Sequence, residues 1–257
     1  MAPERPAPMS DELSRATAAS RRAVLASSAL VALVVLATGL APFDRRTWWL
    51  DVSPVLVTVP ILLVAWRRCP LTPLLYWVVA AALVMLCVGG HYTFERVPAG
   101  LWLQDWLGLQ RNPYDRAGHL VQGLMLAVAA REVLVRTSPL GGSRWLPVVS
   151  VAFALSISAL YELIEWQAAI WSRDGAAAFL GMQGDPWDAQ WDMFMALAGA
   201  TLGASVLARA HDRALARLEG AGTSSLTIHH GPGVAGLAQR PSFAKRTDFS
   251  SASKAEW

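Results

Sequence analysis

The chain has 257 residues, of which 54% are hydrophobic and 16% are charged, with a formal net charge of +3. Soluble domains carry about 25% charged residues, and the polar residues of this chain lie mostly at the ends of long apolar runs. The composition therefore excludes an ordinary soluble domain and indicates a polytopic membrane protein. The small net charge does not suggest nucleic-acid binding, and Cys69 and Cys87 form no disulfide framework or metal-type spacing.

Six membrane-spanning helices are expected after a disordered tail over residues 1–22. The first span, 23–42, follows basic residues as a signal peptide would, but its apolar run is longer than a signal peptide needs, which favours a retained helix. The second, 52–66, is short and contains Pro54 and Pro60, so its length leaves open whether it crosses the whole bilayer. The remaining spans are expected at 71–90, 113–135, 145–171 and 188–209.

The predicted fold class is all-α: a polytopic membrane helical bundle over 23–209, with about six transmembrane helices and disordered tails. The segment "LWLQDWLGL" is too short to cross a membrane and is expected at the interface. Residues 210–257 are expected to begin as a helical extension and to continue as a disordered tail.

The distribution of Lys and Arg predicts the orientation of the bundle. The two tails and the loops on their side hold 16 Lys and Arg residues, against 6 on the other side. Positive charge is retained on the cytoplasmic side of a membrane. We therefore expect a multi-pass protein of the cell inner (plasma) membrane with both termini in the cytoplasm.

Four of the expected helices carry pairs of polar residues to a similar depth near the extracytoplasmic side. Spacings of i,i+3 and i,i+4 put both members of a pair on one helix face. A charged group at mid-membrane costs about 2.5–3.5 kcal/mol, so such groups normally face the bundle interior or water. The pairs are His91/Glu95, Asp115/His119, Glu162/Glu165 and Asp188/Asp192, and Asp185 precedes the last of them.

Two of these helices also begin alike. "NPYDRAGH" (112–119) and "DPWDAQWD" (185–192) share the form Asn/Asp, Pro, aromatic, Asp, then His or Asp four residues later. Asn or Asp before Pro is a good helix N-cap, and an Asp in the first turn complements the helix dipole. We therefore expect the fourth and sixth spans to start in the same way.

The favoured hypothesis from these residues is a divalent-cation site at the extracytoplasmic side. Facing helices of bundles build metal sites from His and carboxylate side chains, and a metal-bound water could attack an envelope lipid or cell-wall precursor with Glu162 or Glu165 as base. Oxygen-rich ligands favour Mg, Mn or Ca, whereas histidines admit Zn or Fe. The candidate ligands are His91, Glu95, Asp115, His119, Asp185, Asp188 and Asp192.

Other interpretations stay open on the sequence alone, including whether the protein is an enzyme. Asp115, Asp185 and Asp188 could act only as helix caps, and Glu162 with Glu165 could form a structural ion pair with an arginine. A non-enzymatic membrane scaffold or partner-binding protein is one alternative function, and an ion-coupled transporter is another. The expected partners are membrane lipids and a lipid-linked substrate, without nucleic acid; a divalent metal ion is the candidate cofactor.

Three segments, "YDRAGHLVQG", "ALYELIEW" and "GMQGDPWDAQWDM", resemble the YjdF family of uncharacterised bacterial inner-membrane proteins, a domain of unknown function. The resemblance covers about residues 45–212. It implies a membrane protein, and it brings no established activity to this chain. The chain is more weakly similar to VanZ-like membrane proteins, which are linked to glycopeptide resistance. That similarity would match Asp115/His119, Glu162 or Glu165, and Asp188/Asp192, but Asp192 stands where the VanZ-like pattern often has Asn.

Overall fold

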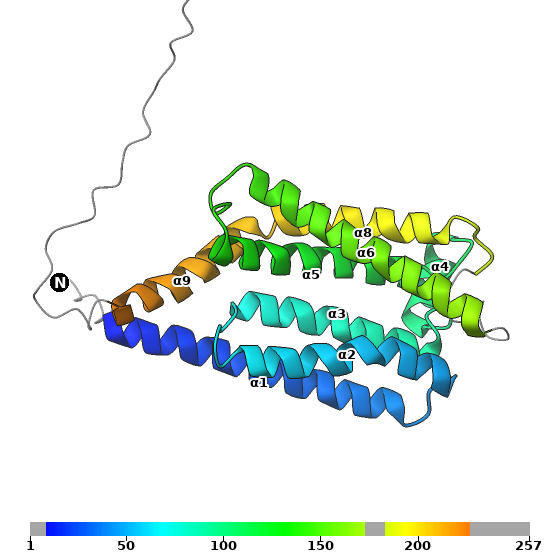
Figure 1. Ribbon diagram of the computed structural model, residues 1–257. Coiled ribbons are helices and arrows are strands. Elements are labelled where there is room, and N and C mark those ends of the chain that lie inside the picture. Colours follow the sequence, from blue (N-terminus) through cyan, green and yellow to red (C-terminus); the bar gives the residue numbers. More distant parts are fainter. Residues whose placement is uncertain (1–8, 173–182, 227–257) are drawn as a thin grey trace, which may run out of the picture.

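A computed structural model describes residues 9–172 and 183–226, and every regular element in these residues is a helix (Figure 1). Five helices are long and apolar enough to cross a membrane, and α8 with α9, bent by 54°, makes a sixth if the pair is one span. The predicted all-α, polytopic bundle is confirmed. The helices are α1 Met9–Gly39, α2 Arg45–Ala65, α3 Pro73–Tyr92, α4 Pro98–Leu107, α5 Tyr114–Thr137, α6 Trp145–Ser172, α8 Asp188–Ser205 and α9 Ala208–Leu226.

The spanning helices form two groups of three. Helices α1, α2 and α3 pack together, as do α5, α6 and α8, and contacts between α3 and α5 join the two groups (Figure 1). Helix α9 continues from α8 and packs against α1. We call the end of the bundle that carries the short helix α4 the α4 end, and the opposite end, beside α9, the α9 end. Helices α5 and α8 both start at the α4 end and therefore run parallel.

Local sequence signals set the helix boundaries. Asp44 is the N-cap of α2, where its side chain accepts a hydrogen bond from the backbone N–H of Thr47 at 2.7 Å. That bond lowers the pKa of the Asp44 carboxyl. Thr72 caps α3 with Pro73 in the first turn, and the left-handed Thr93 (φ 61°) ends it.

Helix α2 is longer than the second predicted span. It starts at Arg45 and has 21 residues, which at 1.5 Å per residue gives about 30 Å, the thickness of a hydrocarbon core. Pro54 and Pro60 lie inside it. The predicted span begins at residue 52, directly after Asp51, whereas the structure places Asp51 inside the helix with 3% of its surface exposed.

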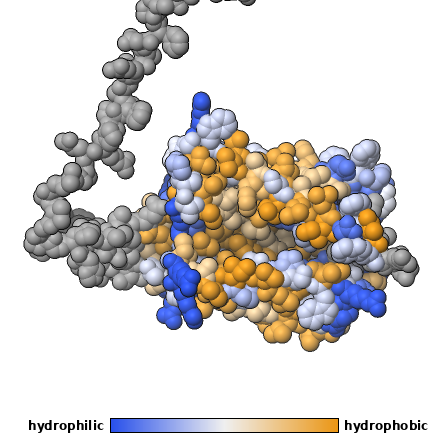
Figure 2. All heavy atoms as spheres, viewed as in Figure 1, coloured by the Kyte–Doolittle hydropathy of each residue, from blue (hydrophilic) through white to orange (hydrophobic). Residues whose placement is uncertain are grey.

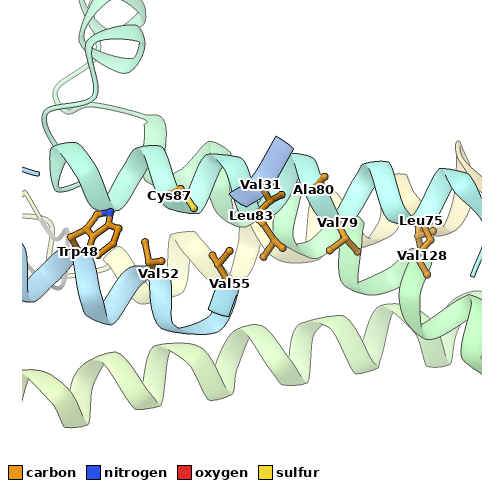
Figure 3. Close-up of a cluster of buried hydrophobic side chains, with 10 residues drawn as sticks. All are labelled: Val31, Trp48, Val52, Val55, Leu75, Val79, Ala80, Leu83, Cys87 and Val128. Carbon is orange, nitrogen blue, oxygen red and sulfur yellow. The ribbon is translucent and has the colours of Figure 1, made fainter. Parts of the chain in front are cut away.

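The apolar residues divide between the core and the outer face. Side chains of α2 point at α3, with Val31 of α1 beside Leu83 in the middle of this cluster and Val128 of α5 beside Leu75 at one end (Figure 3). The outer surface carries an apolar band between two hydrophilic edges (Figure 2), as expected where lipid surrounds the protein. Large side chains in this band, such as Leu36 and Leu163, are more than half exposed.

The expected tails differ in part from the structure. Residues 9–22, predicted to be disordered, are helical and extend α1, so that part of the prediction is corrected. The buried Ser20 explains the ordering, since its hydroxyl donates to the carbonyl oxygen of Leu71 at 2.8 Å. Helix α9 includes residues 210–226. The rest of the predicted tails, 1–8 and 227–257, lies outside the described residues.

Candidate functional site

The site depends on an unusually close approach of α5 and α8. A Cβ atom on Gly123 would lie 2.0 Å from the carbonyl oxygen of Ala196, and one on Gly199 would lie 1.8 Å from that of Leu120. Only glycine lets two helix backbones come this near. Because the helices are parallel, the first turns of both lie side by side at the α4 end.

The segments that enter these helices form matching turns. The side chain of Asn112 accepts a hydrogen bond from the backbone N–H of Tyr114 at 3.0 Å, and Asp185 accepts one from that of Trp187 at 2.9 Å. The predicted likeness of the two starts is therefore visible as two Asx-type turns. The predicted capping is not, since the N-cap residues are Pro113 and Trp187, without side-chain caps.

Arginines from one helix entry bind acids from the other. Arg116 donates to Asp185 at 2.6 Å, and Arg111 forms an ion pair with Asp188. Arg116 also lies over the ring of Trp191, 5.2 Å from its centroid. These contacts hold the starts of α5 and α8 together and neutralise Asp185 and Asp188.

A group of possible metal ligands lies one turn deeper. Asp115, His119 and Asp192 each offer a ligand atom within 4.8 Å of the others. Glu162 on α6 brings its Oε1 to 3.6 Å from Nε2 of His119, and Oδ1 of Asp115 lies 3.7 Å from the same nitrogen. Three helices thus direct four side chains, which we call the inner cluster, toward one point.

The inner cluster contains polar atoms without protein partners. Within the described residues, Nδ1 of His119, Oε1 of Glu162 and Oδ1 of Asp192 are buried and make no hydrogen bond. Buried polar groups are bonded in the great majority of cases. An arrangement that leaves buried polar atoms of three neighbouring side chains without a hydrogen bond is typical of a site that receives a ligand.

Beside the inner cluster lies a cavity of about 270 Å³. It runs between α2, α3, α5 and α6, and both Asp115 and His119 line its polar end. Glu165 and Tyr161 line the same cavity from α6. Its remaining walls are mostly apolar.

Not every predicted ligand reaches this site. His91 bonds to the carbonyl oxygen of Thr38 through Nδ1 at 2.7 Å, and Glu95 forms an ion pair with Arg96. Their predicted pairing fails because the left-handed Thr93 ends the helix between them. Asp185 and Asp188 lie at the start of α8 and bind arginines, as described above. They are not members of the inner cluster.

Asp51 is a residue that the sequence analysis did not identify. Its carboxylate is buried, with Oδ2 unbonded within the described residues, and it interacts electrostatically with those of Asp115 and Glu165. The signal in the sequence is a lone acid in "WWLDVSPV", which falls just outside the predicted span because that span begins at residue 52 and the helix begins at Arg45.

Comparison with known proteins gives two matches. Residues 23–213 match a family described as "Predicted membrane protein (DUF2238)". The chain is 49% identical to "Inner membrane protein YjdF" of Escherichia coli (strain K12) over 195 residues, which are 76% of this chain and 93% of that protein. No solved structure matches the chain.

Proposed function

The chain belongs to the DUF2238 family of predicted membrane proteins and is a multi-pass inner-membrane protein, and from this premise we propose that its inner cluster binds a divalent cation. The site lies at the α4 end, which the distribution of Lys and Arg assigns to the extracytoplasmic side. The observation that supports the proposal most directly is the convergence of Asp115, His119 and Asp192 within 4.8 Å, with buried atoms unbonded.

The separations within the cluster suit a shared ion better than hydrogen bonds. The distances of 3.6 and 3.7 Å from Nε2 of His119 to Glu162 and Asp115 exceed those of good hydrogen bonds. Two ligands bound to one ion at about 2.0–2.2 Å each lie roughly 3–4 Å apart. Small movements of the side chains would therefore complete a coordination shell of one nitrogen and several oxygens.

The charge of the region also favours a cation. Asp115, Asp192 and Glu162 lie around one imidazole, and Glu165 and Asp51 interact electrostatically with Asp115. Of the two nearby arginines, Arg116 binds Asp185, and Arg111 binds Asp188 and lies 4.0 Å from Asp115. Uncompensated charges buried in a membrane protein cost several kcal/mol each. A divalent ion removes much of that cost, and protons taken up by the carboxylates are the competing explanation.

The carboxylates on α6 have distinct proposed roles. Glu162 approaches His119 and is placed to complete the ligand set. Glu165 lines the adjoining cavity and is placed to accept a proton from a water on the ion. The reaction class that fits is metal-assisted attack of water on an envelope lipid or lipid-linked precursor, because the site faces the membrane interior and not an aqueous cleft.

Binding of Mn²⁺ tests the proposal, since this ion accepts both imidazole and carboxylate ligands and is followed by electron paramagnetic resonance. We expect saturable binding to purified, metal-stripped protein in detergent, and at least about a tenfold weaker affinity in Asp192→Asn. At a concentration of about 100 times its Kd, the ion should stabilise the fold by about 2.7 kcal/mol.

Glu95→Gln is the matched control. It also removes one carboxylate from the α4 end, but from a side chain that pairs with Arg96 outside the cluster, so Mn²⁺ affinity should not change. Absence of saturable binding, or equal losses in the two variants, would contradict the proposed site and favour neutralisation by protons.

A further inference from the structure

The cavity beside the inner cluster is a groove that opens sideways from the bundle. Its floor is α5, and its walls are α2 with α3 on one side and α6 on the other. In the described part of the chain, α2 and α6 make at most a slight contact, so the wall is weakest where these helices face each other. Figure 2 shows this face as apolar and hollowed between the two groups of helices.

The groove has the length of one leaflet. It extends along α5 from Asp115 to Met125, which at 1.5 Å per residue is about 15 Å. This is half of a hydrocarbon core about 30 Å thick. Apart from its polar end, the groove is lined by apolar side chains, among them Met85, Met125 and Ile157.

The floor of the groove, α5, leaves empty space at Gly118. A Cβ atom added to Gly118 would meet nothing within 4 Å, whereas one on Gly123, further along the same helix, would clash with α8. Gly118 is therefore not required for helix packing. It widens the groove directly beside His119, where the polar and apolar parts of the cavity meet.

We propose that this groove binds one hydrocarbon chain of a phosphate-bearing membrane lipid, which enters between α2 and α6 and places its phosphate on the cation of the inner cluster. The inference rests on the proposed function, because without a cation the carboxylates would repel an anionic headgroup. With the ion bound, the phosphate oxygens can occupy coordination positions that the protein leaves open, as phosphates do at divalent ions. The structure thereby assigns a substrate class to the site.

Photo-cross-linking tests where the hydrocarbon chain of the lipid binds. The full-length protein is reconstituted with Mn²⁺ in vesicles of phosphatidylethanolamine and phosphatidylglycerol that contain phosphatidylglycerol with a diazirine on one acyl chain. Cross-linked peptides are mapped by mass spectrometry. We expect labels at groove residues such as Met85, Met125 and Ile157, in excess of labels at the lipid-facing residues Leu33 and Leu36 of α1.

Two variants fill the groove, one from its floor and one from a wall, so that the test survives if one of them does not fold. Gly118→Leu fills it from α5 and Ala82→Phe from α3. Each should lower groove labelling about tenfold and leave labelling of α1 unchanged. Gly118→Ala is the matched control, and it should label like the original protein, because a methyl group there meets only open space.

The headgroup requirement is tested in two ways. The same diazirine-bearing acyl chain is placed on diacylglycerol, which lacks phosphate, and Mn²⁺ is removed with a chelator. Both should reduce groove labelling about tenfold. Equal labelling of the groove and α1, or no effect of either filling variant, would overturn the lipid proposal. Mn²⁺ binding measured on the same samples separates the outcomes: binding without groove labelling refutes the lipid proposal alone, and absence of binding refutes the cation site.

Discussion

Glu132 of α5 shows, at the scale of single residues, what a fully satisfied buried acid looks like in this protein. It lies near the α9 end and has no exposed surface. It accepts hydrogen bonds from the backbone N–H and the hydroxyl of Thr72 at 2.8 and 2.6 Å, and it forms an ion pair with Arg136 at 2.8 Å. This acid ties the start of α3 to α5 through bonds to both of its oxygens, whereas Oε1 of Glu162 and Oδ1 of Asp192 in the inner cluster make no hydrogen bond.

His211 of α9 completes this network, and its neighbours define its tautomer. Its Nδ1 lies 2.9 Å from a guanidinium nitrogen of Arg131, which can only donate, so Nδ1 is an acceptor. The hydrogen is therefore on Nε2, which donates to Glu132 at 3.0 Å. A neutral His211 links α9 to the bundle through these two bonds.

Replacing Glu132 should be costly because its partners would stay buried without it. Glu132→Ala should lower the free energy of unfolding by about 3–5 kcal/mol, as expected when one partner of a buried charged network is removed. Thermal and denaturant unfolding in detergent micelles measures this change. Asp212→Asn is the control. It removes a carboxylate that binds Arg131, the arginine bonded to His211, but this carboxylate is on a side chain that is 58% exposed. The change should cost less than about 1 kcal/mol. Similar losses in both variants would contradict the structural role.

At the scale of the helices, the α5/α8 contact decides whether the inner cluster exists. The proposed ligands Asp115 and His119 come from one helix and Asp192 from the other, and glycines set the distance between them. In a membrane, close packing replaces the hydrophobic effect as the force between helices. Gly123 of α5 and Gly199 of α8 therefore position the site as well as stabilise the bundle.

Gly123→Ala tests this contact. Its methyl group would overlap the carbonyl of Ala196, so the helices must separate, and we expect a loss of about 1–3 kcal/mol in stability together with weaker Mn²⁺ binding. Gly118→Ala, in the same helix but facing open space, should be neutral or stabilising by up to about 1 kcal/mol, because alanine favours helix. If both variants unfold at the same temperature, the close approach is not what holds α5 and α8 together.

The sequence predicted what depends on helical periodicity and missed what depends on helix ends and packing. Asp115 and His119 share one face because they are four residues apart within α5, and the structure brings them together. His91 and Glu95 have the same spacing, but the helix stops between them at Thr93, a residue type that rarely marks such an end. The choice of Asp192 and Glu162 as neighbours of His119 required the approach of three helices, which no local pattern encodes.

At the scale of the whole molecule, the two polar clusters lie at opposite ends of an apolar bundle. Along α5, the residues from 123 to 130 that separate the inner cluster from Glu132 are apolar, "GLMLAVAA". A polar path across the membrane would need side chains that continue through this layer. The arrangement therefore favours a site that works at one face of the membrane, and it makes the orientation of the bundle decisive for function.

The two native cysteines provide a test of that orientation. Cys69 is exposed beyond the end of α2, at the α9 end, whereas Cys87 is buried inside the bundle with no exposed surface. The excess of Lys and Arg on the side of the tails predicts that the α9 end lies in the cytoplasm. A membrane-impermeant maleimide should thus label the native protein only after the cells are permeabilised, and only at Cys69.

A second variant places the reactive cysteine at the α4 end instead. Trp106 of α4 is 70% exposed, so Trp106→Cys combined with Cys69→Ser should react with the same maleimide in intact cells. Mass spectrometry of the labelled peptide identifies the reacting residue, and the Cys69→Ser protein without the new cysteine should stay unlabelled because Cys87 is inaccessible. The opposite pattern would place the inner cluster on the cytoplasmic side, where an envelope substrate beyond the membrane could not reach it.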